Sequence, residues 1–285
     1  MQFKAPTALE YFASLVAHDA ALALLEAAAS LAQDAYPAAD PQTVLSEVDA
    51  LAATLGRRLP ADAAPMQRLR LLNHYFFEEL RFEGNVNDYD DPRNSYLCDV
   101  LARRRGIPVS LGVLYIELAS QAGLAVEGVA APGHFLVRLH LPQGEVVIDP
   151  FTGRSLSLPE LEERMQFWRV APDGSTADDA ALAQFLRPAT PREVITRMLR
   201  NLVRIHEQRG DDLALLAVRD RLVTLLPDDW RERRDRGLVR GRVGQIERAR
   251  ADLEAYLAHA PQAQDAADVA RQLLAWRDAP PGTLH

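Results

Sequence analysis

The first part of the chain, up to about residue 80, has the hydrophobic spacing of amphipathic helices. Apolar residues recur every three or four positions over residues 40–56 and again over residues 66–82. The first of these segments opens with Asp40 followed by Pro41, a typical helix cap with proline at the first helical position. This pattern predicts a group of packed helices at the start of the chain.

The middle of the chain changes from helical spacing to short strands. One short helix is expected from Asn94 or Ser95 to Arg105, and a second follows Pro108, with Ser110 as its cap. Three runs rich in Val, Ile, Leu and Phe follow, separated by turn residues, at 124–129, 135–141 and 145–148. They predict a small antiparallel sheet after the helices, so the expected fold class is α+β.

The last third of the chain is helical again and contains an internal repeat. A period of 34 residues is that of the tetratricopeptide repeat. Three positions match at this period: Asn201 with Asp235, Gly210 with Gly244, and Pro227 with Pro261. Small and polar residues at 171–180 indicate a linker before the repeats. The expected domains are an α+β domain over residues 1–170, a linker over 171–187 and an all-α, tetratricopeptide-like domain over 188–285.

Composition excludes several classes of protein. The 285 residues are 48% hydrophobic and 25% charged, without an apolar run of about 20, so a soluble globular protein with no membrane span is expected. The start of the chain lacks the pattern of a secretory signal, which predicts a cytoplasmic location. A single cysteine, Cys98, excludes an internal disulfide and a multi-thiolate zinc site. No cofactor motif is present, and we expect no cofactor and no metal.

The formal net charge is −8, but residues 187–250 hold 16 arginines against 10 carboxylates. A basic segment of this kind can indicate nucleic-acid binding. Here acidic residues accompany the arginines as on solvated helices, so a nucleic-acid partner is not expected.

Two places in the α+β domain carry residues suited to acyl-transfer chemistry. A polar turn leads into the helix that holds Ser95 and Cys98, where a helix start orients a hydroxyl or stabilises a thiolate. The alternatives are an ordinary N-cap for Ser95 and a small buried side chain for Cys98. His134 follows Gly133 at the start of one strand and Asp149 closes the next, as a base and the carboxylate that orients it.

The distance between His134 and Asp149 depends on the turn that joins their strands. A turn centred on Gln143 and Gly144 places Asp149 opposite Arg138, about 13 Å along the strand from His134. A bulge or a strong twist then has to close this gap. The alternative is that His134 only ends a strand and Asp149 only caps a turn.

Three motifs resemble those of a known family. They are NSYLCDVLARRRGIPVSLGVLY at 94–115, GVAAPGHFLVR at 128–138 and IDPFTG at 148–153. They look like the bacterial transglutaminase-like proteins that carry C-terminal tetratricopeptide-type repeats, and the same core is present in some F-box proteins. The resemblance implies a papain-like α+β core that uses a helix-start cysteine, a strand histidine and a neighbouring aspartate. His134 and Asp149 match the last two places.

The cysteine place of the family does not match. In active transglutaminase-type cores the thiol lies about fifteen residues before the Gly-Ile-Pro motif, where this chain has Asp91. Cys98 lies only eight residues before Gly106. The resemblance therefore implies that the usual nucleophile is absent.

Two functions follow from these observations. The first is a peptide- or protein-binding or regulatory protein, a possible pseudoenzyme, with a degenerate cleft that Asn94, Tyr96 and Gly133 help to form. The second is an acyl-transfer hydrolase or protease. Its catalytic residues would be Ser95 or Cys98 as nucleophile, His134 as base and Asp149 as orienting carboxylate.

Overall fold

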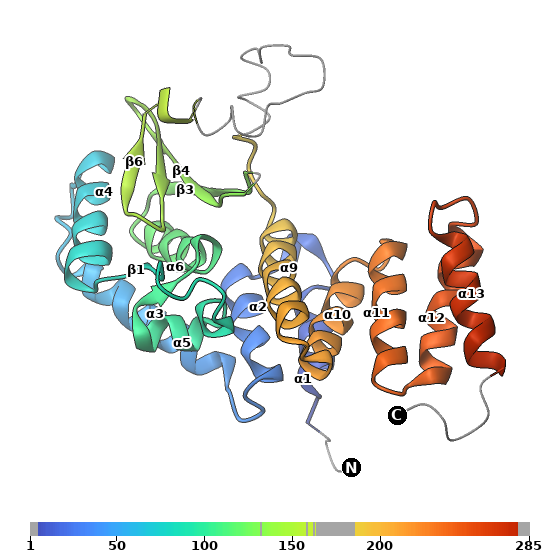
Figure 1. Ribbon diagram of the computed structural model, residues 1–285. Coiled ribbons are helices and arrows are strands. Elements are labelled where there is room, and N and C mark those ends of the chain that lie inside the picture. Colours follow the sequence, from blue (N-terminus) through green and yellow to red (C-terminus); the bar gives the residue numbers. More distant parts are fainter. Residues whose placement is uncertain (1–4, 132, 158, 162, 164–185, 279–285) are drawn as a thin grey trace. The chain divides into compact units, whose positions relative to one another are not determined.

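The computed structural model describes residues 5–131, 133–157, 159–161, 163 and 186–278 (Figure 1). The chain divides into two compact units, His18–Met198 and Met1–Ala17 with Leu199–His285. Most of the predicted linker, 171–187, lies outside the described residues. The domain boundaries predicted from the sequence therefore stay a prediction.

The first unit, His18–Met198, begins with helices that match the hydrophobic spacing. The Asp40 carboxylate accepts a hydrogen bond from the Gln42 backbone N–H at 3.0 Å, and Pro41 begins helix α3, as predicted. Val48 and Leu55 on one face of this helix are buried. The helices of this part of the unit are η1 (Asp19–Ala21), α2 (Leu24–Ser30), η2 (Leu31–Asp34), α3 (Pro41–Gly56), α4 (Pro65–Asn73), η3 (His74–Glu79), η4 (Pro92–Asn94), α5 (Leu97–Arg103) and α6 (Pro108–Gln121).

The helix predicted to run to Phe82 ends earlier than expected. After α4 the chain widens into the π-helical turn η3, and Arg81 then takes a left-handed conformation with φ of 59°. This reversal brings Phe82 back onto Phe76, with the two rings stacked at 4.5 Å between centroids. Both rings are fully buried, so packing of the aromatic side chains accompanies the early end of the helix.

A four-stranded antiparallel sheet with the order β3-β4-β5-β6 follows the helices. Three of its strands were predicted, and the fourth was missed because three residues are too few to show alternation. The strands are β3 (Ala125–Val129), β4 (Leu136–Leu141), β5 (Gly144–Asp149) and β6 (Arg154–Leu156). A separate parallel pair joins β1 (Glu83–Gly84) to β2 (Arg105–Gly106).

Helix α6 packs against β3 and β4 (Figure 1). The ring of Phe135 lies against glycines of both α6 and β3. A Cβ atom at Gly112 of α6 would lie 2.4 Å from this ring, and one at Gly128 of β3 would lie 2.6 Å from it. Only glycine therefore fits at these two positions while the ring keeps its place. Phe135 is 1% exposed, and it directly follows His134.

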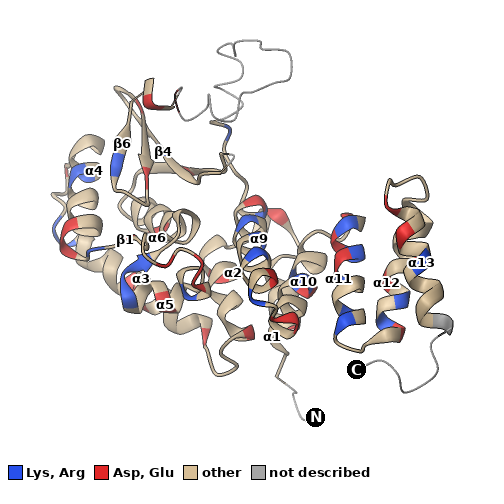
Figure 2. Ribbon diagram, viewed as in Figure 1, with Lys and Arg blue, Asp and Glu red and all other residues tan. Residues whose placement is uncertain are grey.

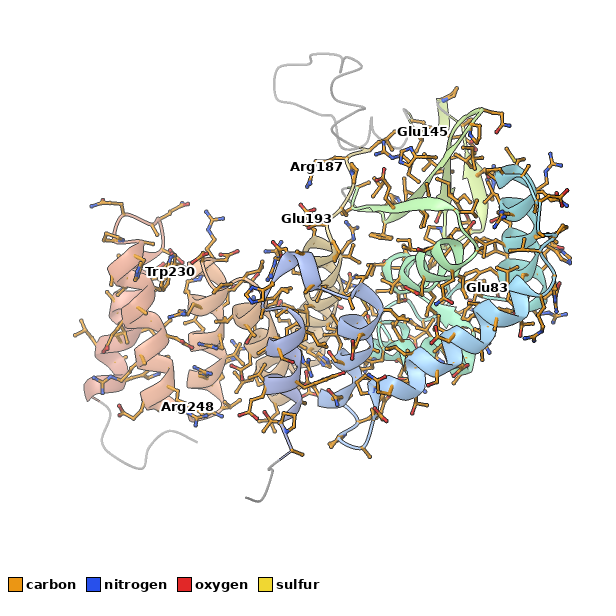
Figure 3. The ribbon with its side chains drawn as sticks, turned by 180° about the vertical axis from the view of Figure 1, so that it is seen from behind. Glu83, Glu145, Arg187, Glu193, Trp230 and Arg248 are labelled. Atoms are coloured by element: carbon orange, nitrogen blue, oxygen red, sulfur yellow. The ribbon has the colours of Figure 1, made fainter. Side chains whose placement is uncertain are left out.

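The chain enters helix α9 (Pro191–Arg209) through a capping box formed by Thr190 and Glu193. The Glu193 carboxylate accepts a hydrogen bond from the Thr190 backbone N–H at 2.8 Å. It also forms an ion pair with Arg187, at 2.5 Å between Nη2 and Oε1; both side chains are labelled in Figure 3. Just before this cap, Pro188 bridges to Val129 of β3. The division between the two units falls within α9, after Met198.

The second unit is helical and has the predicted repeat. Gly210 and Gly244 both have positive φ, 65° and 78°, and each joins two helices at the same place in the 34-residue period. The first helix of the chain, α1, packs on α10, where the Arg221 guanidinium lies over the Phe12 ring at 4.9 Å. Besides the end of α9, the helices described in this unit are α1 (Ala8–Leu15), α10 (Asp212–Leu225), α11 (Trp230–Arg242), α12 (Ile246–His259) and α13 (Ala266–Asp278).

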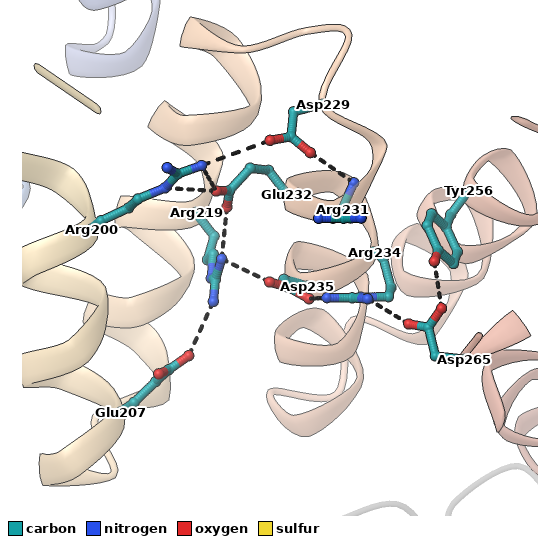
Figure 4. Close-up of polar contacts among 10 residues, drawn as sticks. All are labelled: Arg200, Glu207, Arg219, Asp229, Arg231, Glu232, Arg234, Asp235, Tyr256 and Asp265. Carbon is teal, nitrogen blue, oxygen red and sulfur yellow. Dashed lines mark hydrogen bonds and ion pairs between the residues drawn. The ribbon is translucent and has the colours of Figure 1, made fainter. Parts of the chain in front are cut away.

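Ion pairs within the second unit engage many of the arginines that make this segment basic. Figure 2 shows basic and acidic residues on the same helices of this unit. Arg219 of α10 forms ion pairs with Glu207 at 3.0 Å, Glu232 at 2.7 Å and Asp235 at 3.0 Å (Figure 4). Arg219 and Glu232 are both buried. The charges of Arg219 and Glu232 therefore stabilise contacts inside the unit and are hardly exposed at its surface.

A second group of ion pairs surrounds Asp252 of α12, which is 5% exposed. Asp252 accepts hydrogen bonds from Arg236 at 2.8 and 2.6 Å and from Arg240 at 2.9 Å. Both arginines also donate to Asp220, at 3.2 and 2.8 Å. These contacts join α10, α11 and α12 of the repeat region.

Candidate functional site

The candidate site lies in the first unit, where a polar loop at 85–91 leads into the short turn η4. Asn94, the last residue of this turn, is fully buried. Its side-chain amide donates to the carbonyls of Asp88 at 2.7 Å and Tyr89 at 3.2 Å, and its side-chain carbonyl accepts from Asn85 at 3.0 Å. Asn94 thus fixes the loop that precedes it. A direct contact of Asn94 with substrate stays a prediction.

Asn94 also ties this turn to the start of α6. Its backbone carbonyl accepts a hydrogen bond from the Ser110 hydroxyl at 2.6 Å and from the Ile107 N–H at 3.3 Å. The prediction that Ser110 caps α6 was wrong, because Ile107 is the cap and Pro108 takes the first helical position. Ser110 is the third helical residue, and its hydroxyl accepts a hydrogen bond from the Ile107 N–H at 3.1 Å while it donates to the turn that holds Asn94.

The structure places Ser95 outside the helix that the sequence assigned to it. Helix α5 begins at Leu97, because Pro92 starts a separate turn and Tyr96 is extended, with ψ of 118°. Ser95 is fully buried, and its hydroxyl has no hydrogen-bond partner among the described residues. The Tyr96 ring is also buried and packs edge-to-face on Tyr36 at 5.8 Å. Their predicted roles in catalysis and in substrate contact stay predictions.

Cys98, the other candidate nucleophile, is the second residue of α5 and is partly exposed. Burial raises the pKa of its thiol above the ordinary value, and the neighbouring Asp99 carboxylate raises the pKa further. The thiol is therefore protonated at neutral pH. In this environment Cys98 is a weak nucleophile.

Asp91 occupies the position at which the family resemblance expects a catalytic thiol. Its side chain is buried and forms ion pairs with Arg93 at 2.8 Å and with Arg103 at 3.2 Å. Burial alone would raise the pKa of Asp91, but the hydrogen bonds and charge of Arg93, together with the charge of Arg103, lower it below the ordinary value. This place therefore holds a paired carboxylate.

The register of β4 and β5 brings Asp149 closer to His134 than the sequence predicted. Val137 pairs with Ile148, and one further step of the same register places Asp149 opposite Leu136. The expectation that Asp149 faces Arg138 was wrong. The turn consists of Pro142 and Gln143, between the paired residues Leu141 and Gly144.

Asp149 now lies opposite a residue only two positions from His134, about 7 Å for an extended chain. His134 is partly buried, and its backbone N–H donates to the Ala131 carbonyl at 3.1 Å. Gly133 before it is exposed and has a φ of 70°, which favours glycine in this turn. Direct contact between the His134 ring and the Asp149 carboxylate stays a prediction.

Asp149 is 4% exposed and caps the turn that follows β5. Its carboxylate accepts a hydrogen bond from the Phe151 N–H at 2.9 Å, and its backbone carbonyl accepts one from the Gly153 N–H at 2.8 Å. Asp149 therefore caps this turn, which was the alternative role considered for it. The cap uses carboxylate oxygen Oδ1.

The polar loop that Asn94 holds and the turn that Asp149 caps lie against each other. The Gly84 N–H donates to the Phe151 carbonyl at 3.0 Å, and a Cβ atom at Gly84 would lie 2.3 Å from the Phe151 ring. The Tyr89 ring lies 6.0 Å from the Phe151 ring. The structure thus brings together the segments that carry Asn94 and Asp149.

Sequence reasoning missed one further residue at this site, Arg197 of α9. Its Nη1 donates to the carbonyl of Ala131 at 2.8 Å, in the segment that leads to His134. Burial lowers the pKa of Arg197, and an electrostatic interaction with Tyr89 acts in the opposite direction. The signal in the sequence was an arginine between the apolar residues Ile195 and Met198.

No group of three histidine, cysteine, aspartate or glutamate side chains within the described ranges is arranged to hold a metal ion. In the same part of the chain, no helix is both long enough and apolar enough to cross a membrane.

The fold and site define a transglutaminase-like α+β unit followed by helical repeats. The family model described as transglutaminase-like superfamily matches residues 42–200, and the model described as tetratricopeptide repeat matches residues 202–274. The chain belongs to the transglutaminase-like superfamily, together with the bacterial UPF0162 proteins. The resemblance inferred from the three motifs is therefore confirmed, as is the 34-residue repeat.

Several curated proteins are similar to this chain. A UPF0162 protein of Xylella fastidiosa (strain 9a5c) is 40% identical over 242 residues, which cover 84% of each chain. A UPF0162 protein of Pseudomonas aeruginosa is 34% identical over 208 residues, 72% of this chain and 73% of the relative. The human F-box only protein 21 is 29% identical over 174 residues, 57% of this chain and 26% of that protein. No solved structure matches the chain significantly.

Proposed function

We propose that this protein binds a peptide or protein segment at the transglutaminase-like site and does not cleave it. The observation that carries the proposal is Asp91. Where the family resemblance expects a thiol, the chain has a buried carboxylate that is paired with Arg93 and Arg103. A paired carboxylate of lowered pKa is a poor nucleophile, and no thiol is available at that place.

The two other candidate nucleophiles support the same proposal. Ser95 is fully buried, and a serine hydroxyl needs an adjacent base to react. The pKa of Cys98 is raised, which disfavours its thiolate. Tetratricopeptide repeats generally mediate protein–protein contacts, so the match at residues 202–274 also fits a protein-binding role. The proposed location is the cytoplasm, where a chain with a single cysteine suits a reducing environment.

The test compares covalent labelling of the full chain and three variants, Ser95→Ala, Cys98→Ala and His134→Ala. Fluorophosphonate probes report an activated serine, and chloroacetamide probes report an activated cysteine. We expect no labelling above the level of the urea-unfolded chain, with the folding of each variant checked by circular dichroism.

Labelling of the wild type that His134→Ala abolishes would refute the binding proposal. It would favour the hydrolase or protease, because loss on removing the histidine means that this residue activates the nucleophile. Loss of labelling in Ser95→Ala or in Cys98→Ala alone would then identify the nucleophile.

A further inference from the structure

Arg197 differs from most arginines of the chain in its electrostatic surroundings. Among the described residues, no carboxylate forms an ion pair with it, and its one hydrogen bond goes to the Ala131 carbonyl. An exposed arginine such as Arg248, labelled in Figure 3, needs no partner because water solvates it. Arg197 is partly buried, so the fold removes part of this water and supplies no countercharge.

The hydrogen bond to Ala131 leaves one edge of the guanidinium unused. Nη1 makes this bond, whereas Nε and Nη2 donate to no described residue. These two nitrogens form an edge with parallel N–H bonds, which matches the two oxygens of a carboxylate. The hydrogen bond to Ala131 also restricts the side chain, which reduces the entropy lost when a ligand binds.

Two neighbours of Arg197 place its guanidinium beside the candidate site. Ala131 precedes the turn of Gly133 and His134, and Tyr89 is close enough to interact electrostatically with Arg197. The Tyr89 ring, which lies 6.0 Å from the Phe151 ring, connects the surroundings of Arg197 to the turn that Asp149 caps. The buried acid of the adjacent loop, Asp91, is already paired with other arginines.

We propose that Arg197 binds a carboxylate of the peptide or protein segment that occupies this site. The carboxylate is either the C-terminus of the segment or an aspartate or glutamate side chain. This inference rests on the proposed function, and it names the chemical class of ligand that the site selects.

The experiment measures the binding of short peptides to the full chain by fluorescence anisotropy. Three sets of randomised peptides act as probes: free C-terminal acids without aspartate or glutamate, C-terminal amides with one internal glutamate, and C-terminal amides without any carboxylate. We expect the strongest binders only among the first two sets. The set that binds more tightly identifies the source of the carboxylate.

Variants then test whether Arg197 is responsible. Arg197→Gln is expected to weaken binding of the selected peptide about tenfold or more, because it removes a charge-assisted bidentate contact. Arg197→Lys keeps the charge and a donor for Ala131 but loses the planar edge, so we expect an intermediate loss. Arg192→Gln is the matched control: it removes the same charge from the same helix, where Arg192 pairs with Asp19.

The outcomes separate this inference from the proposed function. Peptide binding that is equally strong without a carboxylate, or unchanged in Arg197→Gln, would overturn the role of Arg197 and leave the proposed function standing. Loss of affinity in Arg192→Gln as large as in Arg197→Gln would also overturn it, because net charge would then explain the effect. If no set binds to the wild type, the proposed function fails, and this inference with it.

Discussion

Replacing Asp252 by asparagine should strongly destabilise the helical repeat unit. The carboxylate is 5% exposed and accepts three hydrogen bonds, two from Arg236 and one from Arg240. Asparagine has nearly the same shape but no charge, so both guanidinium groups would then share only Asp220. Removal of one partner from a buried ion pair typically costs about 3–5 kcal/mol.

We expect a loss near the lower end of this range, about 3 kcal/mol, because Asp220 remains and both arginines keep some contact with water. Urea unfolding followed by tryptophan fluorescence is the assay, since Trp230 and Trp276 lie on α11 and α13 of this unit. In thermal unfolding the same loss lowers Tm by more than about 10 °C.

The matched control is Asp268→Asn, the same chemical change at an exposed ion pair. Asp268 pairs with Arg271, and both side chains are more than two-thirds exposed. Exposed pairs contribute at most about 1 kcal/mol, so this variant should unfold almost like the wild type. Equal and small effects of the two substitutions would refute the reasoning, because the ion pairs around Asp252 would then be no stronger than surface pairs.

Two further predictions concern single side chains. His206 is buried, and neither of its ring nitrogens has a hydrogen-bond partner among the residues that the structure describes. Burial lowers its pKa from 6.5; the Asp211 charge opposes this shift and the Arg209 charge adds to it. The unfolded state therefore binds the proton more readily than the folded state. The contribution of His206 to the free energy of unfolding is fully present above about pH 7 and is lost as the pH drops through 6.5. Urea midpoints between pH 8 and 5.5 should show this slope in the wild type and a smaller one in His206→Leu; parallel slopes would contradict it. In the folded chain, Cys98 should react with Ellman's reagent at pH 8 several-fold more slowly than glutathione, because its pKa is raised. After unfolding in urea it should react as fast as glutathione. A fast reaction of the folded chain would contradict the raised pKa of Cys98.

Much of the fold could be predicted from local sequence signals. Asp40 with Pro41, and Thr190 with Glu193, identify helix starts because they satisfy backbone N–H groups locally. The repeat was visible because Gly210 and Gly244 meet the same backbone requirement. Signals that act over three or four residues are readable without knowledge of the tertiary contacts.

The errors arose where a distant contact decided the local structure. Ser110 resembles an N-cap, but it is the third helical residue, and its hydroxyl joins the Ile107 N–H to the carbonyl of Asn94 in another segment. The turn between β4 and β5 could have had two registers, and the sequence alone does not select between them. Arg197 was overlooked because its significance depends on Ala131, 66 positions earlier in the chain.

The close fit around Phe135 has a consequence for attempts to alter the peptide binding that we propose for this site. Gly112 and Gly128 leave no space for a side chain beside this ring, so a substitution at either would shift the residue next to it, His134. A combinatorial library aimed at new specificities should keep both glycines constant. Diversity belongs instead at Val86 and Asp88, which are exposed on the polar loop and can vary without disturbing the protein interior.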